Sequence, residues 1–314
     1  MKPVLVSVIG PTAVGKTKLG IEISKRFNGE VINGDSMQVY QQFNIGSAKV
    51  TDEEAEGIPH HLIDLLSPEN EYSAARFKED LQVTVDEITE RSKLPVLVGG
   101  TGFYIQSALY NFNFSSVERD EEYVEKAIED IKQNGVEPYY NKLKEVDPVQ
   151  ANKIHPNNIR RVVRALEVFD RTGKPMSQYE AEQTYDSPYN AMIIGLDMER
   201  ETLYERINQR VDEMIEVGLI EEVRNLYQTY GSDLQPMQGI GYKEWVPYLK
   251  GERGFDETVE LVKQNTRKFA KRQLTYYRNK LDRVQWYTID PEHYTETFET
   301  IFEDLAGFLK ELEE

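Results

Sequence analysis

The chain has 314 residues, of which 39% are hydrophobic and 29% are charged, and its formal net charge is −18. These values are typical of a soluble protein with one large domain or two smaller ones, and no segment approaches the ~18–20 apolar residues of a membrane span. The absence of cysteine excludes disulfides, thiolate zinc sites and cysteine nucleophiles, and the four histidines disfavour a multi-histidine metal centre. Because the first apolar run is too short for a signal peptide, we expect a cytoplasmic protein without a membrane partner. No pattern indicates an oligomer, and a monomer is the default expectation.

The N-terminal third of the chain alternates between strand and helix patterns. Apolar, β-branched runs predict buried strands, and apolar residues spaced three or four apart predict helices. The predicted strands are Val4–Ile9, 31–32 and Leu94–Val98, with another short apolar run at 62–66, and the predicted helices are 16–27 and 74–91. This alternation predicts an α/β fold with a doubly wound parallel sheet.

The pattern changes after Tyr110. Residues 118–185 are predicted to be all-helical, a strand pattern returns at 191–196, and the chain from Arg200 onward is predicted to be mostly helical. We therefore expect a discontinuous catalytic core of residues 1–113 and 188–314, interrupted by an all-helical insertion domain of residues 114–187.

Residues 10–17 match the phosphate-binding pattern G-x-x-x-x-G-K-[ST], between a predicted strand and a predicted helix. The glycines allow backbone N–H groups to surround an anion, and the helix N-terminus adds positive potential. In this pattern the lysine reaches the outer phosphate oxygens and the hydroxyl of the last residue, Thr17, binds Mg²⁺. The predicted P-loop, which holds a di- or triphosphate, consists of Gly10, Pro11, Thr12, Ala13, Val14, Gly15, Lys16 and Thr17.

Asp35 and Thr101 each follow a predicted strand, where the ligands of open parallel sheets bind. Both should therefore face the same crevice as the P-loop. Asp35 is interpreted as a general base or an outer ligand of magnesium, and the alternative is an aspartate that caps a turn. Thr101 lies between glycines and is interpreted as a hydrogen-bond donor to phosphate, and the alternative is a plain turn threonine.

Residues 263–283 contain eight basic residues and one acid, Asp282, which leaves a local charge of +7 in an acidic chain. Such a stripe is compatible with a nucleic-acid partner, and the alternative is a solvated helix face. Tyr276 and Tyr277 interleave with the stripe and are interpreted either as stacking platforms for bases or as core residues of the helix.

Many ordered motifs resemble those of the bacterial tRNA dimethylallyltransferase family, also called isopentenyl-tRNA transferases. The resemblance covers nearly the whole chain. Besides the P-loop, it rests on GDSMQVY at 34–40, IGSAK at 45–49, PHHLID at 59–64, YSAA at 72–75, VGGTGFY at 98–104, IHPNN at 154–158, RRVVRALE at 160–167, GYK at 241–243 and TRKFAKRQ at 266–273.

The resemblance implies transfer of a dimethylallyl group from dimethylallyl diphosphate to N6 of the adenosine immediately 3′ of the anticodon in tRNA. The P-loop and Mg²⁺ would then hold the leaving diphosphate. Asp35 would accept the proton of the adenine amine, Thr101 would stabilise the leaving group, and Arg224 would be the arginine near the reacting groups. From the residues alone, the favoured interpretation of Arg224 is an i, i+3 ion pair with Glu221 on a helix surface.

The partner that the resemblance implies is the anticodon stem-loop of tRNA, whose target adenosine must leave its stack to reach a pocket. The implied tRNA contacts are Asp35, Ser36, Met37, Gln38, Thr101, Arg160, Arg161, Arg164, Gly241, Tyr242, Lys243, Arg267, Lys271, Arg272 and Arg278.

Three other functions fit parts of the pattern. A P-loop small-molecule or nucleotide kinase would not need the basic stripe. A prenyltransferase acting on free adenine nucleotides would not need the cluster of Arg160, Arg161 and Arg164. A non-enzymatic RNA-binding protein would not need Lys16 or Asp35.

Overall fold

The computed structural model describes residues 2–112, 114, 120–183 and 186–314. The chain divides into two compact units, one formed by Met1–Tyr110 with Ser187–Glu314 and the other by Asn111–Asp186.

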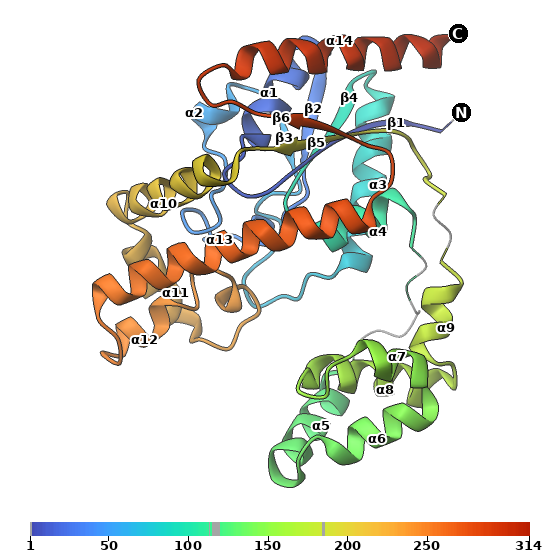
Figure 1. Cartoon of the computed structure of the whole chain (residues 1–314), viewed down its shortest axis with the longest axis vertical. Coiled ribbons are helices and arrows are strands. Elements are labelled where there is room, and N and C mark those ends of the chain that lie inside the picture. Colours follow the sequence, from blue (N-terminus) through green and yellow to red (C-terminus); the bar gives the residue numbers. More distant parts are fainter. Residues whose placement is uncertain (1, 113, 115–119, 184–185) are drawn as a thin grey trace. The chain divides into compact units, whose positions relative to one another are not determined.

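A six-stranded parallel sheet forms the centre of the larger unit, with the strand order β3-β2-β4-β1-β5-β6 (Figure 1). The strands are β1 Val4–Ile9, β2 Gly29–Asn33, β3 His60–His61, β4 Leu94–Val98, β5 Asn190–Asp197 and β6 Val284–Thr288. β1 pairs with β4 on one side and β5 on the other, and Leu5, Val6, Val8 and Ile9 are fully buried. Near-continuous apolar strands of this kind are typical of a parallel sheet, and the predicted α/β architecture with a parallel sheet is confirmed.

Two segments of the sheet differ from the prediction. β6 lies in a region predicted to be mostly helical, although Val, Trp, Tyr and Thr in Val284–Thr288 are strand formers. It pairs only with β5, as an edge strand. The apolar run 62–66 is not a strand, since the short β3 precedes it and Leu66 forms only an isolated bridge with Tyr40.

The helices of the larger unit follow or precede these strands and supply the apolar faces that pack against the sheet. In α3, for example, Phe77, Leu81, Val85 and Ile88 recur at helical spacing and are buried. No helix among the described residues is long and apolar enough to cross a membrane. The helices are α1 Lys16–Arg26, α2 Asp52–Ala55, α3 Ala74–Glu90, α4 Gly102–Leu109, α10 Arg200–Glu216, α11 Leu219–Tyr230, α12 Trp245–Leu249, α13 Phe255–Lys280 and α14 Tyr294–Glu313, with a 3₁₀ turn at Pro236–Gln238.

The smaller unit is helical throughout its described elements. Its helices are α5 Glu121–Asn134, α6 Glu137–Val146, α7 Pro148–Lys153, α8 Ile159–Thr172 and α9 Met176–Ala181. α8 is the central one, because Val162 and Leu166 pack in one apolar cluster with α6 and α7, while Val163 packs in a second cluster with α5. The ends of the predicted helical region, at 118–119 and 184–185, lie outside the described residues.

Candidate functional site

The loop at residues 10–17 connects the end of β1 to the start of α1 at Lys16. Its two glycines have positive φ angles, 151° at Gly10 and 106° at Gly15, which disfavour side chains there. A Cβ atom on Gly10 would also lie 2.6 Å from the carbonyl oxygen of Leu196. The local sequence therefore allows a loop that turns sharply from a buried strand into the N-terminus of a helix.

Lys16 lies inside the turn of this loop, where its Nζ donates a hydrogen bond of 2.7 Å to the Pro11 carbonyl. Burial lowers the pKa of Lys16 to about 7, opposed by the charge of Asp35 and aided by that of Arg210. A desolvated ammonium group at the turn of such a loop is suited to receive an anionic ligand. Thr17 is exposed in the first turn of α1, next to Lys16 in the chain.

A cavity of about 450 Å³ opens at this loop. α10 contributes two arginines to its wall, and Arg206 Nε donates to the Ala13 carbonyl at 3.1 Å. Burial lowers the pKa of Arg210, and Asp35 is among the charges that raise it. The lining residues are Ala13, Gly15, Lys16, Thr17, Lys18, Ile21, Glu22, Glu54, Glu56, Arg206, Gln209, Arg210 and Glu213.

Arg206 and Arg210 were not predicted as site residues. They are four residues apart on α10, the helix that follows β5, so they share one face at the carboxyl edge of the sheet. Their one signal in the sequence is this position after a predicted strand, which they share with Asp35 and Thr101, but it does not distinguish them from the other cation of the same helix, Arg200.

Asp35 follows β2, and its carboxylate accepts a 2.8 Å hydrogen bond from the Met37 backbone N–H. Burial raises its pKa, while the Met37 hydrogen bond and the charges of Lys16 and Arg210 oppose that shift. The carboxyl group therefore caps its own turn, as the alternative interpretation held, and it also lies close enough to Lys16 and Arg210 for their charges to affect it.

Thr101 follows β4 and ties this loop to the loop after β2. Its Oγ1 accepts a hydrogen bond from the Ser36 N–H at 2.9 Å and donates to Ser36 Oγ at 3.1 Å. The two loops approach closely, since a Cβ atom on Gly99 would lie 2.3 Å from the Gly34 carbonyl oxygen. The adjacent strands β2 and β4 thus bring Asp35, Ser36 and Thr101 together.

The other residues predicted after β2 have structural partners. The Gln38 side chain donates to the carbonyls of Ser47 and Ala48. The side chain of Met37 packs at Gly239, where a Cβ atom would lie 2.7 Å from Met37 Cε.

Of the predicted GYK segment, only Lys243 is exposed. Tyr242 is fully buried, and its hydroxyl donates to Glu222 at 2.7 Å. The same Glu222 carboxylate accepts the backbone N–H groups of Asn44, Ile45 and Gly46. Tyr242 therefore supports the 44–46 loop.

Arg224 does not line the cavity at the Gly10–Thr17 loop. It lies on α11, where its side chain is 42% exposed and pairs with Glu221 three residues earlier. This is the surface ion pair that the residues alone had suggested as the alternative. The arginines that the structure brings to the loop are instead Arg206 and Arg210.

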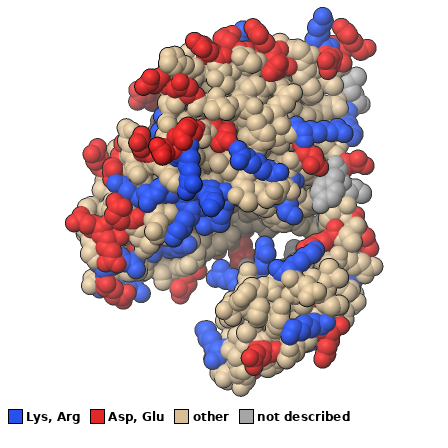
Figure 2. Space-filling view, viewed as in Figure 1, with Lys and Arg blue, Asp and Glu red and all other residues tan. Residues whose placement is uncertain are grey.

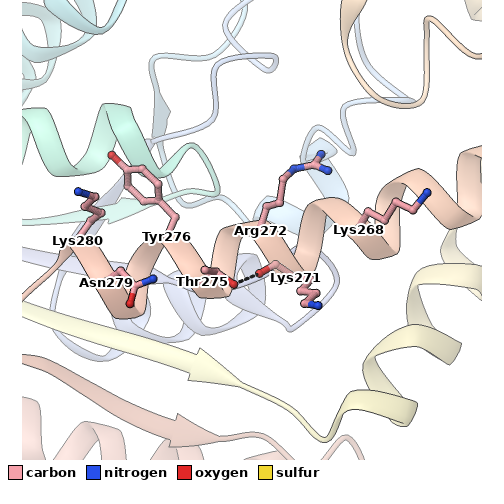
Figure 3. Close-up of a pocket in the computed structure, with 7 residues that line it drawn as sticks. All are labelled: Lys268, Lys271, Arg272, Thr275, Tyr276, Asn279 and Lys280. Atoms are coloured by element: carbon pink, nitrogen blue, oxygen red, sulfur yellow. Dashed lines mark hydrogen bonds between the residues drawn. The ribbon is translucent and has the colours of Figure 1, made fainter. Parts of the chain in front are cut away.

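α13 presents a second cavity, of about 520 Å³, along a basic face (Figures 2 and 3). Lys and Arg side chains gather over this helix in Figure 2. Among the residues of the helix, Lys271 and Arg272 are exposed. The cavity is lined by Lys268, Lys271, Arg272, Thr275, Tyr276, Asn279 and Lys280.

Two other predicted cations of α13 lie outside this cavity and have partners of their own. Arg267 donates to the Asn208 side chain, and Arg278 pairs with Asp197 at the end of β5. Lys268 and Lys280, which were not among the predicted tRNA contacts, line the cavity.

The two neighbouring tyrosines differ. Tyr277 is fully buried and its hydroxyl points to the Gly99 carbonyl, so it is a core residue. Tyr276 is half-buried, lines the basic cavity and donates its hydroxyl to Gln106. A Cβ atom on Gly102 would lie 2.5 Å from its ring, so the glycine makes room for that ring.

In the smaller unit, Arg160 and Arg161 are exposed in the first turn of α8. Arg164 is half-buried and donates at 2.8 Å to Glu167, whose side chain is fully buried. The predicted trio therefore separates into two available cations and one structural ion pair.

At one edge of a parallel sheet, the larger unit combines a loop with two glycines, flanking cations and a partly buried carboxyl group. This fold and site define an α/β protein in which the edge beyond the carboxyl ends of the strands is suited to an anionic ligand. The chain belongs to the IPP transferase family, whose model matches residues 38–280. The resemblance noted in the sequence is confirmed.

The chain is similar to curated members of the family along almost its whole length. It is 52% identical over 311 residues to the tRNA dimethylallyltransferase of Oceanobacillus iheyensis, with 99% of both chains covered. It is 48% identical to that of Bacillus pumilus, with 98% of this chain and 96% of the relative covered.

Solved structures agree with these relatives. The tRNA isopentenylpyrophosphate transferase of Bacillus halodurans is 45% identical, with a TM-score of 0.74 over 99% of this chain and 98% of that one. A eukaryotic dimethylallyltransferase acting on tRNA is 31% identical, with a TM-score of 0.86 over 99% of this chain and 80% of that one.

Proposed function

We infer that the protein transfers a dimethylallyl group from dimethylallyl diphosphate to N6 of the adenosine 3′-adjacent to the anticodon in tRNA, and releases diphosphate. Its family membership and the names of its relatives make it a tRNA dimethylallyltransferase, an enzyme that modifies tRNA. The observation that carries the finer mechanism is the gathering of the Gly10–Thr17 loop, Arg210 and Asp35 at one edge of the sheet.

The Gly10–Thr17 loop acts as a P-loop that holds the diphosphate. As the carbon–oxygen bond breaks, negative charge grows on the departing oxygens, and the loop N–H groups, Lys16 and Arg210 stabilise that charge. We assign this role to Arg210, because Arg224 is engaged in an exposed ion pair and does not line the cavity.

The residues at the loop fit a magnesium ion held mainly by the substrate. Among the described residues no group of three or more His, Cys, Asp or Glu side chains could hold a metal. Mg²⁺ commonly uses few protein ligands together with phosphate oxygens and water. Thr17, which is exposed and lines the cavity together with Lys16, is the residue that would hold it, and the ion would neutralise charge on the leaving diphosphate.

Asp35 acts as the proton acceptor for the adenine amine. The N6 lone pair forms the bond to the allylic carbon, the carbon–oxygen bond breaks, and one N6 proton passes to the Asp35 carboxylate. Burial keeps this carboxylate a better base than an exposed one. Thr101, tied to Ser36, orients the same loop.

The tRNA is held by phosphate contacts to exposed cations, of which Lys271 and Arg272 on α13 and Arg160 and Arg161 on α8 are available. Tyr276, on the wall of the basic cavity, offers an aromatic ring to an unstacked base. Tyr242 and Arg164 have structural roles within their own units, because each is committed to a glutamate.

The test is group transfer from labelled dimethylallyl diphosphate in the presence of Mg²⁺, with unmodified tRNA, AMP or ATP as the second reactant. Label on tRNA alone supports the proposal. Label on AMP alone would assign a free-nucleotide prenyltransferase, and ATP turnover without transfer would assign a kinase.

A further inference from the structure

The side chain of Gln273 on α13 is hydrogen-bonded to two loops, and these loops have different roles in the proposed reaction. Its side chain is 5% exposed. Oε1 accepts a 2.9 Å hydrogen bond from the Thr12 backbone N–H, and Nε2 donates a 2.8 Å hydrogen bond to the Gly100 carbonyl. The amide orientation follows from its partners, because a backbone N–H only donates and a carbonyl only accepts.

The two anchor points lie on opposite sides of the proposed reaction. Thr12 belongs to the Gly10–Thr17 loop, which holds the leaving diphosphate in the proposed function. Gly100 directly precedes Thr101, and a Cβ atom on Gly100 would lie 3.4 Å from Asp35 Oδ2. One carboxamide therefore links the leaving-group side to the side that carries the base.

We propose that Gln273 is a positioning residue for group transfer, which fixes the diphosphate loop relative to Asp35 and Thr101 through its two hydrogen bonds. This rests on the proposed function. The site is built around the amide, since a Cβ atom on Gly100 would lie 2.6 Å from Gln273 Nε2 and would displace it. The relative position of the two loops matters because a small displacement of a reacting group lowers the reaction rate by a large factor.

The decisive variants are Gln273→Leu and Gln273→Glu. Leucine fills the space and makes neither hydrogen bond. A neutral glutamic acid can make both, with its carbonyl accepting from Thr12 and its O–H donating to Gly100, whereas an ionised one makes only the first. Burial raises the pKa of a carboxyl group, so the Gln273→Glu variant should regain function as the pH falls.

The titratable groups near this point are Asp35, Lys16 and Arg210, together with Tyr276 and Tyr277 on α13. Their own titration affects the parent protein as well. The measured quantity is therefore the ratio of variant to parent kcat at each pH from 6 to 8.5, in which these shared contributions cancel.

For Gln273→Leu we expect kcat to fall roughly 10- to 100-fold at every pH, with the KM for tRNA within about twofold. For Gln273→Glu we expect a similar decrease in kcat at pH 8.5, and this decrease should become smaller as the pH is lowered to 6. Gln264→Leu is the matched control on the exposed side of the same helix, and it should match the parent. A pH-independent ratio for Gln273→Glu, or a kcat of Gln273→Leu within twofold of the parent, would overturn the proposal.

Gly100→Ala perturbs the same hydrogen bond from the other side and leaves α13 unchanged, so it serves if a Gln273 variant fails to fold. It should lower kcat to a similar extent, and parent-like kcat would overturn the proposal. Calorimetry of inorganic diphosphate binding in the presence of Mg²⁺ distinguishes a failure of the proposed function from a failure of the role of Gln273. A parent protein that binds diphosphate but transfers no group contradicts the proposed function. Equal diphosphate affinity and equal kcat in the parent and Gln273→Leu contradict only the role of Gln273.

Discussion

Burial disfavours the charged forms of both Asp35 and Lys16, and the charge of each residue favours the charged form of the other. Asp35 was predicted from its position after a strand, and the loops after β2 and β4 do bring it beside Ser36 and Thr101. Arg210 was missed, because a lone arginine on an amphipathic helix carries no motif and only the packing of α10 at the loop reveals it. At the residue scale, residues that belong to a motif or directly follow a strand, such as Asp35, could be predicted from the sequence. The residues that approach them from other helices, such as Arg210, could not.

Replacement of the proposed base gives the first prediction. Asp35→Asn keeps an oxygen that can accept the Met37 N–H but removes the proton acceptor. We expect kcat to fall roughly 10²- to 10⁴-fold, with the Kd for tRNA unchanged. The measurement is single-turnover transfer alongside a tRNA-binding titration, and turnover within a few-fold of the parent would show that Asp35 is not the base.

The pKa of Asp35 gives a second prediction. Asp35 accepts a proton only when ionised, so activity is present above its pKa and is lost as the pH falls through it. Because burial raises this pKa, the acid limb of kcat/KM should lie at higher pH than an ordinary aspartate gives. A pH–rate profile checks this, and an acid limb at or below the usual aspartate range would contradict it.

The two candidate arginines can be compared directly. Arg210→Ala should lower kcat roughly 10²- to 10³-fold, the cost of removing a donor from a developing anion. Arg224→Ala should stay within about twofold, because it removes only an exposed ion pair. Steady-state kinetics on both variants, with thermal melts to confirm folding, decide between them, and the opposite order would restore Arg224 as the functional arginine.

At the scale of elements, α13 has two faces with different tasks. Its buried side carries Gln273 and Tyr277 to the 99–100 turn, and its exposed side carries Lys271 and Arg272. The basic stripe was predicted from local charge alone. Which of its cations are available was not, because the partners of Arg267 and Arg278 come from α10 and β5.

The strands show the same division. Strong apolar runs such as β1 and β4 were predicted with correct ends, whereas β6 was missed. Its residues are only partly buried at the edge of the sheet, so its periodicity is weak, and its pairing with β5 is a tertiary contact.

Removal of the available cations of α13 should weaken tRNA binding. For the double variant Lys271→Ala and Arg272→Ala we expect a lower affinity and a salt dependence of log K reduced by about one for each lost phosphate contact. The matched control is Lys250→Ala with Lys310→Ala, both exposed and outside the cavity lining. Fluorescence titration at several salt concentrations measures this, and equal slopes for the two double variants would remove α13 from the tRNA-binding surface.

At the scale of the whole molecule, the two units differ in content. The larger unit contains the complete proposed diphosphate site, and the smaller unit contributes helices with exposed arginines. The change from alternating to all-helical patterns after Tyr110 could be read from periodicity.

This division predicts separable effects on the two substrates. Arg160→Ala with Arg161→Ala should weaken tRNA binding, more visibly at lower salt, and leave diphosphate affinity unchanged. Arg164→Ala should instead lower the melting temperature, because it leaves the buried Glu167 without its cation. Titrations with both ligands and thermal melts test this, and unchanged tRNA affinity in the double variant would exclude α8 from the tRNA contacts.

The central claim is that the Gly10–Thr17 loop holds a leaving diphosphate, so that carbon–oxygen rather than phosphorus–oxygen bond cleavage takes place beside it. The most direct test uses dimethylallyl diphosphate with ¹⁸O in the oxygen that bridges carbon and phosphorus. Mass spectrometry of the products after reaction with tRNA should find all the label in the released diphosphate and a tRNA that gained the hydrocarbon group alone. Loss of ¹⁸O from the diphosphate, or phosphate on the tRNA, would contradict the account.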